Sequence, residues 1–288
     1  MARPFGGGPF SLRAGIGNGP AVSPRHLSSG VMPAPTSDLL PHPPVAPVGW
    51  SPGPPDYVGV GTARSGTTWW DSLVSAHPQV SRPSDTPKEV HYFDRVWEGA
   101  LSEADIQRYH AFFARPDGHL SGEWTPGYML DVWTPRLLRL AAPEARLLVL
   151  LRDPVERFRS GRTLAENRFT VGSTARAAAN AAFNRGIYAD QLTRLYSAFP
   201  REQVLVLQYE RCVVDPSAQL RRTYEFIGLD PAVPEGLDVS GRVNESRGAK
   251  VVLSEWQEDQ LARHYAPQNE RLAAMLPDLD LSLWKRPR

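Results

Sequence analysis

The sequence predicts an α/β protein with three layers, in which a central parallel sheet lies between helices. The first observation is a set of three short, continuously apolar segments, which are typical of strands buried on both faces. The second is their alternation with segments whose apolar residues recur at helical spacing. The third is a glycine-bearing segment directly after the first strand, at the end of a parallel strand where such folds bind ligands.

The three predicted strands cover residues 56–61, 145–154 and 203–210. The strongest signal is ARLLVLLRDP (145–154), a continuous apolar run that ends at Arg-Asp-Pro. The predicted helices cover residues 66–78, 101–116, 133–143, 154–166, 173–200, 215–229 and 253–276. We expect Ser102 to cap the second helix, a break near Gly186, and an interruption at Pro267.

Proline, glycine and serine crowd the first 55 residues, which show no apolar period. Such a segment buries too little apolar surface to offset the entropy cost of ordering it. We therefore expect residues 1–55 to be a disordered tail and residues 56–288 to form the folded domain. An extended arm packed on the domain is the alternative for the tail.

The bulk composition excludes several classes of protein. Hydrophobic residues make up 41% of the 288 residues and charged residues 22%, as in an ordinary globular protein. The net charge of +1 provides no field that would attract nucleic acid or a membrane surface. No apolar run is long enough to span a bilayer, and we expect no signal peptide. Cys212 is the only cysteine, so we expect a packed thiol and a cytoplasmic protein.

The segment after the first strand, GTARSGTTWW, has the spacing of a phosphate-binding loop with one substitution. Gly61 and Gly66 stand where a Walker A loop has its glycines, but Thr67 occupies the position of the lysine. The basic side chain lies inside the loop instead, at Arg64. Further donors come from three hydroxyl side chains: Ser65, Thr67 and Thr68. Because a helix start binds anions, the loop predicts a P-loop-like fold and a site for an oxyanion group; a plain strand–helix turn is the alternative.

Two motifs together resemble the nucleotide site of sulfotransferases that use 3′-phosphoadenosine-5′-phosphosulfate (PAPS). RSGTTW, which starts at Arg64, is similar to their 5′-phosphosulfate loop. VLLRDPVERFRSG is similar to the second half of their signature and contains Arg152 and Ser160. The resemblance implies that Arg152 and Ser160 hold the 3′-phosphate, a role that suits the fork-shaped guanidinium. It also implies PAPS as the donor and 3′-phosphoadenosine-5′-phosphate (PAP) as the product.

Three further segments resemble the heparan-sulfate type of sulfotransferase. KEVHYFD (88–94) is similar to the segment that carries its catalytic glutamate, and GEWTPGYM (122–129) to its EKTPxY segment. VNESRGAK (243–250) is similar to a C-terminal loop that closes over the nucleotide, which implies that Arg247 and Gly248 bind it. The resemblance covers most of the predicted domain.

The resemblance implies an in-line transfer of the sulfuryl group from PAPS to an acceptor. Glu89 is the implied general base, and Arg64, in place of the family's loop lysine, is the implied cation at the leaving oxygen. His91 and Asp94 fall on matching positions and are expected to orient the base or the acceptor. His91 as the base is one alternative, and a solvated loop without a catalytic role is another. No metal is expected, since no cluster of histidine and acidic residues has the spacing of a metal site.

Departures from the family pattern bear on the acceptor. Arg64 keeps the charge of the loop lysine without its point-like geometry. Trp124 stands where the EKTPxY segment has lysine, so a cation is lost and the indole is a candidate wall for the acceptor. Ala249 replaces an arginine of the C-terminal loop, with Lys250 as a candidate substitute. The missing lysine and the low net charge argue against a highly anionic polysaccharide.

The sequence thus predicts a PAPS-dependent sulfotransferase that modifies a hydroxyl, with an amine as second choice. The expected acceptor is a small or medium molecule such as a glycoside or secondary metabolite, and residues 166–184 are expected to border it. A P-loop kinase or nucleoside-triphosphatase is the first alternative, which the missing Walker lysine disfavours. A catalytically inactive nucleotide-binding protein on the same fold is the second. The oligomeric state stays open.

Overall fold

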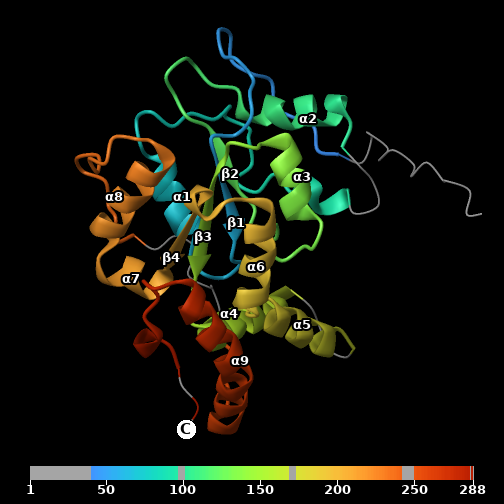
Figure 1. Ribbon diagram of the computed structural model, residues 1–288, viewed down its shortest axis with the longest axis vertical. Helices are drawn as coiled ribbons and strands as arrows, with labels where there is room; N and C mark the ends of the chain where they lie inside the picture. Colours follow the sequence, from blue (N-terminus) through green and yellow to red (C-terminus); the bar gives the residue numbers. More distant parts are fainter. Residues whose placement is uncertain (1–39, 97–100, 169–172, 242–249, 286, 288) are drawn as a thin grey trace, which may run out of the picture. The chain divides into compact units, whose positions relative to one another are not determined.

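A four-stranded parallel sheet forms the centre of the domain (Figure 1). The computed structural model describes residues 40–96, 101–168, 173–241, 250–285 and 287. The strands lie in the order β2-β1-β3-β4, with bounds β1 Tyr57–Gly61, β2 Gly122–Trp124, β3 Arg146–Leu151 and β4 Val204–Gln208. Because neighbouring strands are parallel, their carboxyl ends meet at one edge, which faces α4 and α9.

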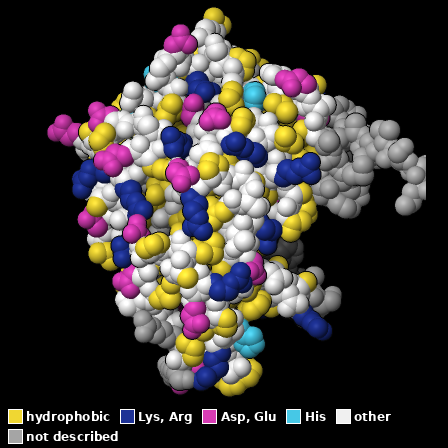
Figure 2. Space-filling model, in the orientation of Figure 1, with side chains coloured by type: hydrophobic (Ala, Val, Ile, Leu, Met, Phe, Trp, Pro, Cys, Tyr) yellow, Lys and Arg dark blue, Asp and Glu magenta, His cyan; other side chains and the backbone are white. Residues whose placement is uncertain are grey.

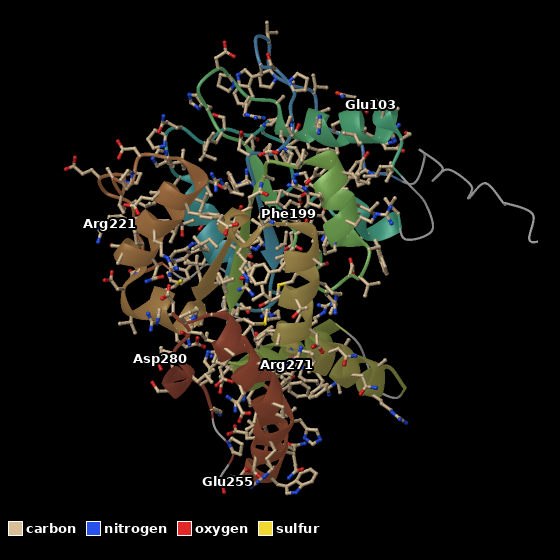
Figure 3. The ribbon with its side chains drawn as sticks, viewed as in Figure 1. Glu103, Phe199, Arg221, Glu255, Arg271 and Asp280 are labelled. Atoms are coloured by element: carbon tan, nitrogen blue, oxygen red, sulfur yellow. The ribbon has the colours of Figure 1, made fainter. Side chains whose placement is uncertain are left out.

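The α-helices that the structure describes are α1 Thr67–Ser75, α2 Glu103–His110, α3 Thr134–Ala141, α4 Pro154–Arg168, α5 Ser173–Asn184, α6 Tyr188–Ala198, α7 Tyr209–Val214, α8 Pro216–Ile227 and α9 Glu255–Met275. They alternate with the strands along the chain, so the predicted α/β fold with a central parallel sheet is confirmed. In Figure 3, Phe199 lies at the centre of the domain, whereas Glu103 on α2 and Arg221 on α8 are exposed at the periphery.

Alternate residues of the strands pack into two cores on opposite faces of the sheet. Leu147 and Val149 of β3 belong to the core that includes α3 and α6, whereas Leu148 and Leu150 belong to the core that includes α1 and α8. The alternation follows from the two-residue period of a strand. Because helices cover both faces, residues 147–151 of β3 are all buried, and this explains why they are continuously apolar.

Local signals in the sequence set several helix ends. Ser102 caps α2 as predicted, since its Oγ accepts from the Asp105 N–H at 3.2 Å and the Asp105 carboxylate accepts from the Ser102 N–H at 2.9 Å. The predicted break near Gly186 is confirmed and separates α5 from α6. A Cβ at Gly186 would lie 2.8 Å from the ring of Tyr265, so the close approach of α9 requires glycine there.

Two short elements were not predicted from the sequence. β2 has three residues and pairs with β1 from Tyr57 opposite Gly122 to Gly59 opposite Trp124. Three residues that include glycine and glutamate show no strand period. The other element is α7, which begins at Tyr209, within the segment that was predicted to continue as a strand to residue 210. The carboxyl end of β4 is therefore shorter than expected.

The predicted interruption at Pro267 is wrong, because α9 continues through this residue. A proline inside a helix removes one backbone hydrogen bond and costs about 3 kcal/mol. Contacts on both sides of the proline hold the helix in place: Tyr265 donates to the Phe183 carbonyl oxygen at 3.0 Å, and Arg271 lies 2.7 Å from Asp190. Tertiary packing here outweighs the local preference.

The predicted tail requires a correction in its last part. Residues 1–39 lie outside the described residues, but residues 40–55 are described and lie on the domain. Leu40 is 3% exposed and belongs to a core cluster. The Ser51 N–H donates to the Arg115 carbonyl oxygen at 3.0 Å, and the reverse bond measures 3.1 Å. This segment is therefore the extended packed arm, which needs no apolar period because it contributes few side chains to the core.

Candidate functional site

Internal hydrogen bonds and one glycine shape the loop between β1 and α1. Thr62 Oγ1 lies 2.6 Å from Ser65 Oγ and donates to the Leu150 carbonyl oxygen at 2.9 Å. Gly66 has a φ of 89°, and a Cβ there would lie 2.7 Å from the ring of Tyr209. Gly66 is also the N-cap of α1, so a bulkier residue would disturb the start of the helix. The loop thus brings the first N–H groups of α1 to the carboxyl edge of the sheet, where they can bind an anion.

The second motif meets this loop in space. The Arg64 Nε donates to Ser160 Oγ of α4 at 3.1 Å. The Arg152 Nη1, just after β3, donates to the backbone carbonyl oxygen of Arg64 at 3.3 Å. The Arg152 guanidinium also lies 4.9 Å from the ring centroid of Tyr209. Residues that the sequence linked only through two separate motifs therefore form one corner with two guanidinium groups.

Lys88 extends toward the start of α1 from the segment that carries the predicted base. Its Nζ lies 3.3 Å from Thr67 Oγ1 and 2.9 Å from Glu89 Oε1. The Lys88 side chain is 19% exposed. No motif assigned a role to Lys88, because the sequence does not show that residues 67 and 88 are neighbours. Its ammonium joins the loop between β1 and α1 to the predicted base.

Glu89, His91 and Asp94 form a chain of ion pairs. Glu89 Oε2 lies 3.2 Å from His91 Nε2, and His91 Nδ1 lies 2.7 Å from Asp94 Oδ2. Their side chains are 38%, 50% and 40% exposed, so the chain remains accessible to a ligand. Both ring nitrogens of His91 face carboxylate oxygens, and an imidazole must be doubly protonated to donate to both.

These contacts shift the pKa values of the two central groups. The hydrogen bond from His91, together with Lys88, lowers the pKa of Glu89 to about 2. The hydrogen bonds to Asp94 and then to Glu89 raise the pKa of His91 to about 10. At neutral pH Glu89 is therefore an anion and His91 a cation. In this arrangement His91 has no lone pair with which to accept a proton.

Two of the predicted catalytic residues share an unusual backbone conformation. Arg64 has a φ of 71° and His91 a φ of 54°, and these are the non-glycine residues with positive φ in the part of the chain that the structure describes. Such conformations are sterically disfavoured and occur preferentially at functional sites. A hydrogen bond from the His91 N–H to Thr125 Oγ1, at 3.2 Å, helps to hold the second of them.

The comparison with known proteins identifies the family. The model of the sulfotransferase family matches residues 55–234, which is more than half of the chain. The chain belongs to the sulfotransferase family. Its fold agrees with this, because a solved sulfotransferase from Alicyclobacillus acidocaldarius superimposes with a TM-score of 0.64 and 24% identity, over 81% of this chain and 100% of the other. The P-loop-like α/β fold is confirmed.

Curated relatives include sulfotransferases of the predicted branch. Over 193 residues the chain is 29% identical to human heparan sulfate glucosamine 3-O-sulfotransferase 6, which covers 63% of this chain and 54% of that protein. Over 190 residues it is 28% identical to human heparan sulfate glucosamine 3-O-sulfotransferase 3B1. This match covers 61% of this chain and 46% of that protein. The chain thus spans about half the length of these relatives. The resemblance to the heparan-sulfate branch is confirmed.

In this member of the sulfotransferase family, β2 and the residues after it fix the segment that carries the predicted base. Three consecutive backbone N–H groups, those of residues 90–92, donate to side chains at 3.0, 3.2 and 2.8 Å: Glu123, Thr125 and Tyr128. Glu123 is fully buried and also accepts from the Tyr109 hydroxyl at 2.8 Å. Burial raises the pKa of Glu123. These supporting residues lie in the segment matched by resemblance, but their bonds to residues 90–92 are evident only in the fold.

Trp124 lies in the core of the domain. It is 0% exposed, its ring covers Gly59 so closely that a Cβ there would lie 2.0 Å from the indole, and its Nε1 donates to the Gly61 carbonyl oxygen at 3.1 Å. The expected role as an acceptor wall is thus not available to Trp124 in this conformation. Trp69 and Trp70 are also buried, and Cys212 is a packed thiol as predicted.

Some predictions fall outside the described residues. Arg247 and Gly248 of the C-terminal loop are among them, as is part of the segment expected to border the acceptor. Within the described residues there is no cluster of three or more histidine, cysteine or acidic side chains that could hold a metal ion. No helix in the same part of the chain is long and apolar enough to cross a membrane.

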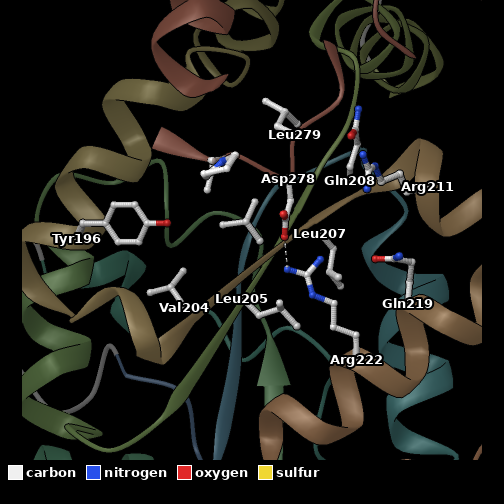
Figure 4. Close-up of a pocket in the computed structure, with 13 residues that line it drawn as sticks. Tyr196, Val204, Leu205, Leu207, Gln208, Arg211, Gln219, Arg222, Asp278 and Leu279 are labelled. Carbon is white, nitrogen blue, oxygen red and sulfur yellow. Dashed lines mark hydrogen bonds and ion pairs between the residues drawn. The ribbon is translucent and has the colours of Figure 1, made fainter. Parts of the chain in front are cut away.

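A separate pocket lies beside the outer strand β4 (Figure 4). Leu205 and Leu207 line it, and an ion pair of 3.0 Å between Arg222 and Asp278 lies at its side. None of the predicted catalytic or nucleotide-binding residues that the structure describes belongs to its lining. We therefore assign the functional site to the loop corner, where the charged groups of the two motifs and the KEVHYFD segment converge.

Proposed function

We propose that this sulfotransferase uses PAPS and transfers its sulfuryl group to a hydroxyl of a small or medium acceptor, such as a glycoside. The observation that carries the proposal is the meeting of Arg64, Ser160 and Arg152 at the start of α1. A phosphosulfate and a separate phosphate on one nucleotide require two adjacent anion sites. The loop with Arg64 offers the first, and Arg152 with Ser160 offers the second.

In the proposed reaction a bond forms between the acceptor oxygen and sulfur as the bond between sulfur and the phosphate oxygen breaks. PAP leaves with the electron pair of the broken bond, and the acceptor proton passes to Glu89. Arg64 stabilises the negative charge that grows on the leaving oxygen. The loop hydroxyls of Ser65, Thr67 and Thr68 are further candidate donors to the 5′ end of the nucleotide.

Glu89 is the proposed base because it is anionic at neutral pH and half-exposed. Its two cationic neighbours lower its affinity for a proton, and a base works best when its pKa is near the working pH. We therefore propose that the acceptor hydroxyl takes the place of His91 at Glu89, while Lys88 stays in contact with Glu89. Asp94 would then retain His91 beside the base through the 2.7 Å contact.

The charge of the surface supports a neutral acceptor over a long anionic polymer. On the face that Figure 2 shows, Lys and Arg side chains are spread among acidic and apolar side chains. The net charge of the whole chain is +1. Recognition of a highly charged polysaccharide usually needs a continuous basic stripe. The curated relatives named above are heparan sulfate glucosamine sulfotransferases, which supports a carbohydrate as the acceptor. An amine acceptor and a cytoplasmic location stay predictions.

Calorimetric titration with PAP, and with magnesium-ATP for comparison, tests this function. We expect the wild type to bind PAP and to ignore magnesium-ATP. Arg152→Ala should lose about tenfold or more of the affinity for PAP, because a charge-assisted contact to phosphate is removed. A preference for magnesium-ATP would instead support the kinase or triphosphatase alternative. Binding of PAP without turnover in an acceptor screen would support the inactive nucleotide-binding protein.

A further inference from the structure

Lys88 occupies a position between the two halves of the site. Its ammonium contacts Thr67 Oγ1 at 3.3 Å on the side of the loop and Glu89 Oε1 at 2.9 Å on the side of the base. A lysine that merely paired with its neighbour at the surface would contribute little to stability. The second contact holds the ammonium at the first residue of α1, where an anion would meet the helix.

The backbone explains how Lys88 reaches this place. The Trp124 N–H donates to the Lys88 carbonyl oxygen at 2.9 Å, so the two residues are neighbours across the chain. Trp124 occupies the position at which the resembling segment of the family carries its lysine. The indole of Trp124 is buried over β1, whereas the Lys88 side chain extends to the loop. The Lys88 side chain thus brings a positive charge to the loop from the residue that is hydrogen-bonded to Trp124.

The ammonium of Lys88 still has capacity for a ligand. An ammonium group has three N–H donors. Within the described residues, its side-chain contacts are the hydroxyl of Thr67 and the carboxylate of Glu89. The side chain is 19% exposed, so the group is neither buried in the core nor free in solvent. A sulfuryl oxygen placed between the loop and the base would lie within reach of the remaining donor.

We propose that Lys88 is a second catalytic cation that binds the sulfuryl group of the donor. This inference rests on the proposed function. The Lys88 ammonium donates to a sulfuryl oxygen while the bond from sulfur to the acceptor oxygen forms and the bond from sulfur to the phosphate oxygen breaks. The acceptor proton passes to Glu89, the electron pair leaves with PAP, and Lys88 keeps its proton throughout. The Glu89 carboxylate holds the Lys88 ammonium at the required place.

A binding comparison tests the proposal without an acceptor. Calorimetry would measure the affinities for PAPS and for adenosine 3′-monophosphate, which lacks the phosphosulfate, in the wild type, Lys88→Met and Lys88→Arg. We expect Lys88→Met to bind PAPS about tenfold more weakly and adenosine 3′-monophosphate as well as the wild type does. Lys88→Arg should recover part of the PAPS affinity because it restores the charge. Arg136→Met, which removes an exposed charge on α3, is the matched control and should bind both nucleotides normally.

Each other outcome has one meaning. Unchanged PAPS affinity in Lys88→Met, with a wild type that binds PAPS, overturns the role of Lys88 and leaves the proposed function intact. An equal loss for both nucleotides also overturns it, because such a loss indicates a general disturbance of the site. If the wild type binds neither PAPS nor PAP, the proposed function itself fails, and the inference about Lys88 fails with it.

Discussion

In the candidate site each charged side chain is paired with a side chain of opposite charge. Lys88, Glu89, His91 and Asp94 alternate in sign, and consecutive members are in contact. This alternation keeps Glu89 ionised and His91 protonated over the physiological range of pH. The candidate site therefore holds the proposed base, Glu89, between Lys88 and His91 without a ligand.

The titration of His91 checks this arrangement. NMR of the His91 ring should give a midpoint near the pKa of about 10, far above the usual 6.5, because Asp94 and Glu89 stabilise the charged ring. The stability that protonated His91 gains from Asp94 and Glu89 should be fully present below pH 6.5 and should be lost as the pH rises toward 10. Asp94→Asn should lower the midpoint. A midpoint near 6.5 in the wild type would contradict the ion-pair chain.

Removal of the proposed base should affect turnover and spare nucleotide binding. We expect Glu89→Gln to reduce kcat by about 10²-fold or more, as is usual for the loss of a general base. The affinity for PAP should change little, because Glu89 is proposed to contact the acceptor and not the nucleotide. Steady-state kinetics and calorimetry on the same preparation would check this. A Glu89→Gln enzyme with normal kcat would shift the role of base to another group.

At the scale of elements, the buried carboxylate of Glu123 on β2 helps to hold the segment that carries the proposed base. Glu123→Ala would leave the Val90 N–H and the Tyr109 hydroxyl without their shared acceptor. We expect the free energy of unfolding to fall by about 3 kcal/mol, because each buried unsatisfied group costs about 1–3 kcal/mol. Urea denaturation would measure it. Glu225→Ala, an exposed glutamate of α8, is the control and should change stability by less than about 0.5 kcal/mol.

The C-terminal segment supports the turn that carries Arg152. Trp284 Nε1 donates to Glu210 Oε2 at 3.0 Å, and the other oxygen of Glu210 accepts from the Asp153 N–H at 2.9 Å. The Lys285 N–H donates to Asp153 Oδ2 at 2.8 Å. This contact chain links the end of the domain to the residue that follows Arg152.

Loss of one bond in this chain should weaken nucleotide binding. Trp284→Phe keeps most of the buried ring but removes the N–H that Glu210 accepts. We expect the affinity for PAP to fall several-fold because Arg152 is displaced. Calorimetry would measure this affinity. Trp256→Phe, at a tryptophan that is 70% exposed on α9, should leave it unchanged. Equal affinities in both variants would show that the C-terminal segment does not position the site.

At the scale of the whole molecule, the low net charge predicts weak binding to polyanions. With a charge of +1 we expect the chain to elute from a heparin column below about 0.15 M salt, where exposed charges are screened beyond about 8 Å. Retention at higher salt would reveal a basic surface that favours an anionic polysaccharide. The elution of lysozyme on the same column provides a strongly basic reference.

The sequence by itself determined the class of fold, the two nucleotide motifs and the family. The apolar run of β3 indicated a strand covered on both faces. The spacing of the loop after β1 indicated an anion site at the carboxyl edge of the sheet. These features are local, because strand period, glycine spacing and capping residues act within one segment. The same local rules missed β2, which is too short to show a period, and wrongly predicted an interruption of α9 at Pro267.

Only the tertiary structure decided how the charged residues meet. It brought Lys88 to Thr67, buried Trp124 over β1 and placed Glu123 under the segment of the base. It also packed residues 40–55 on the domain, although their composition is that of a disordered tail. These facts depend on contacts between segments distant in the chain, and such contacts leave no period or spacing in the sequence that a local rule can detect.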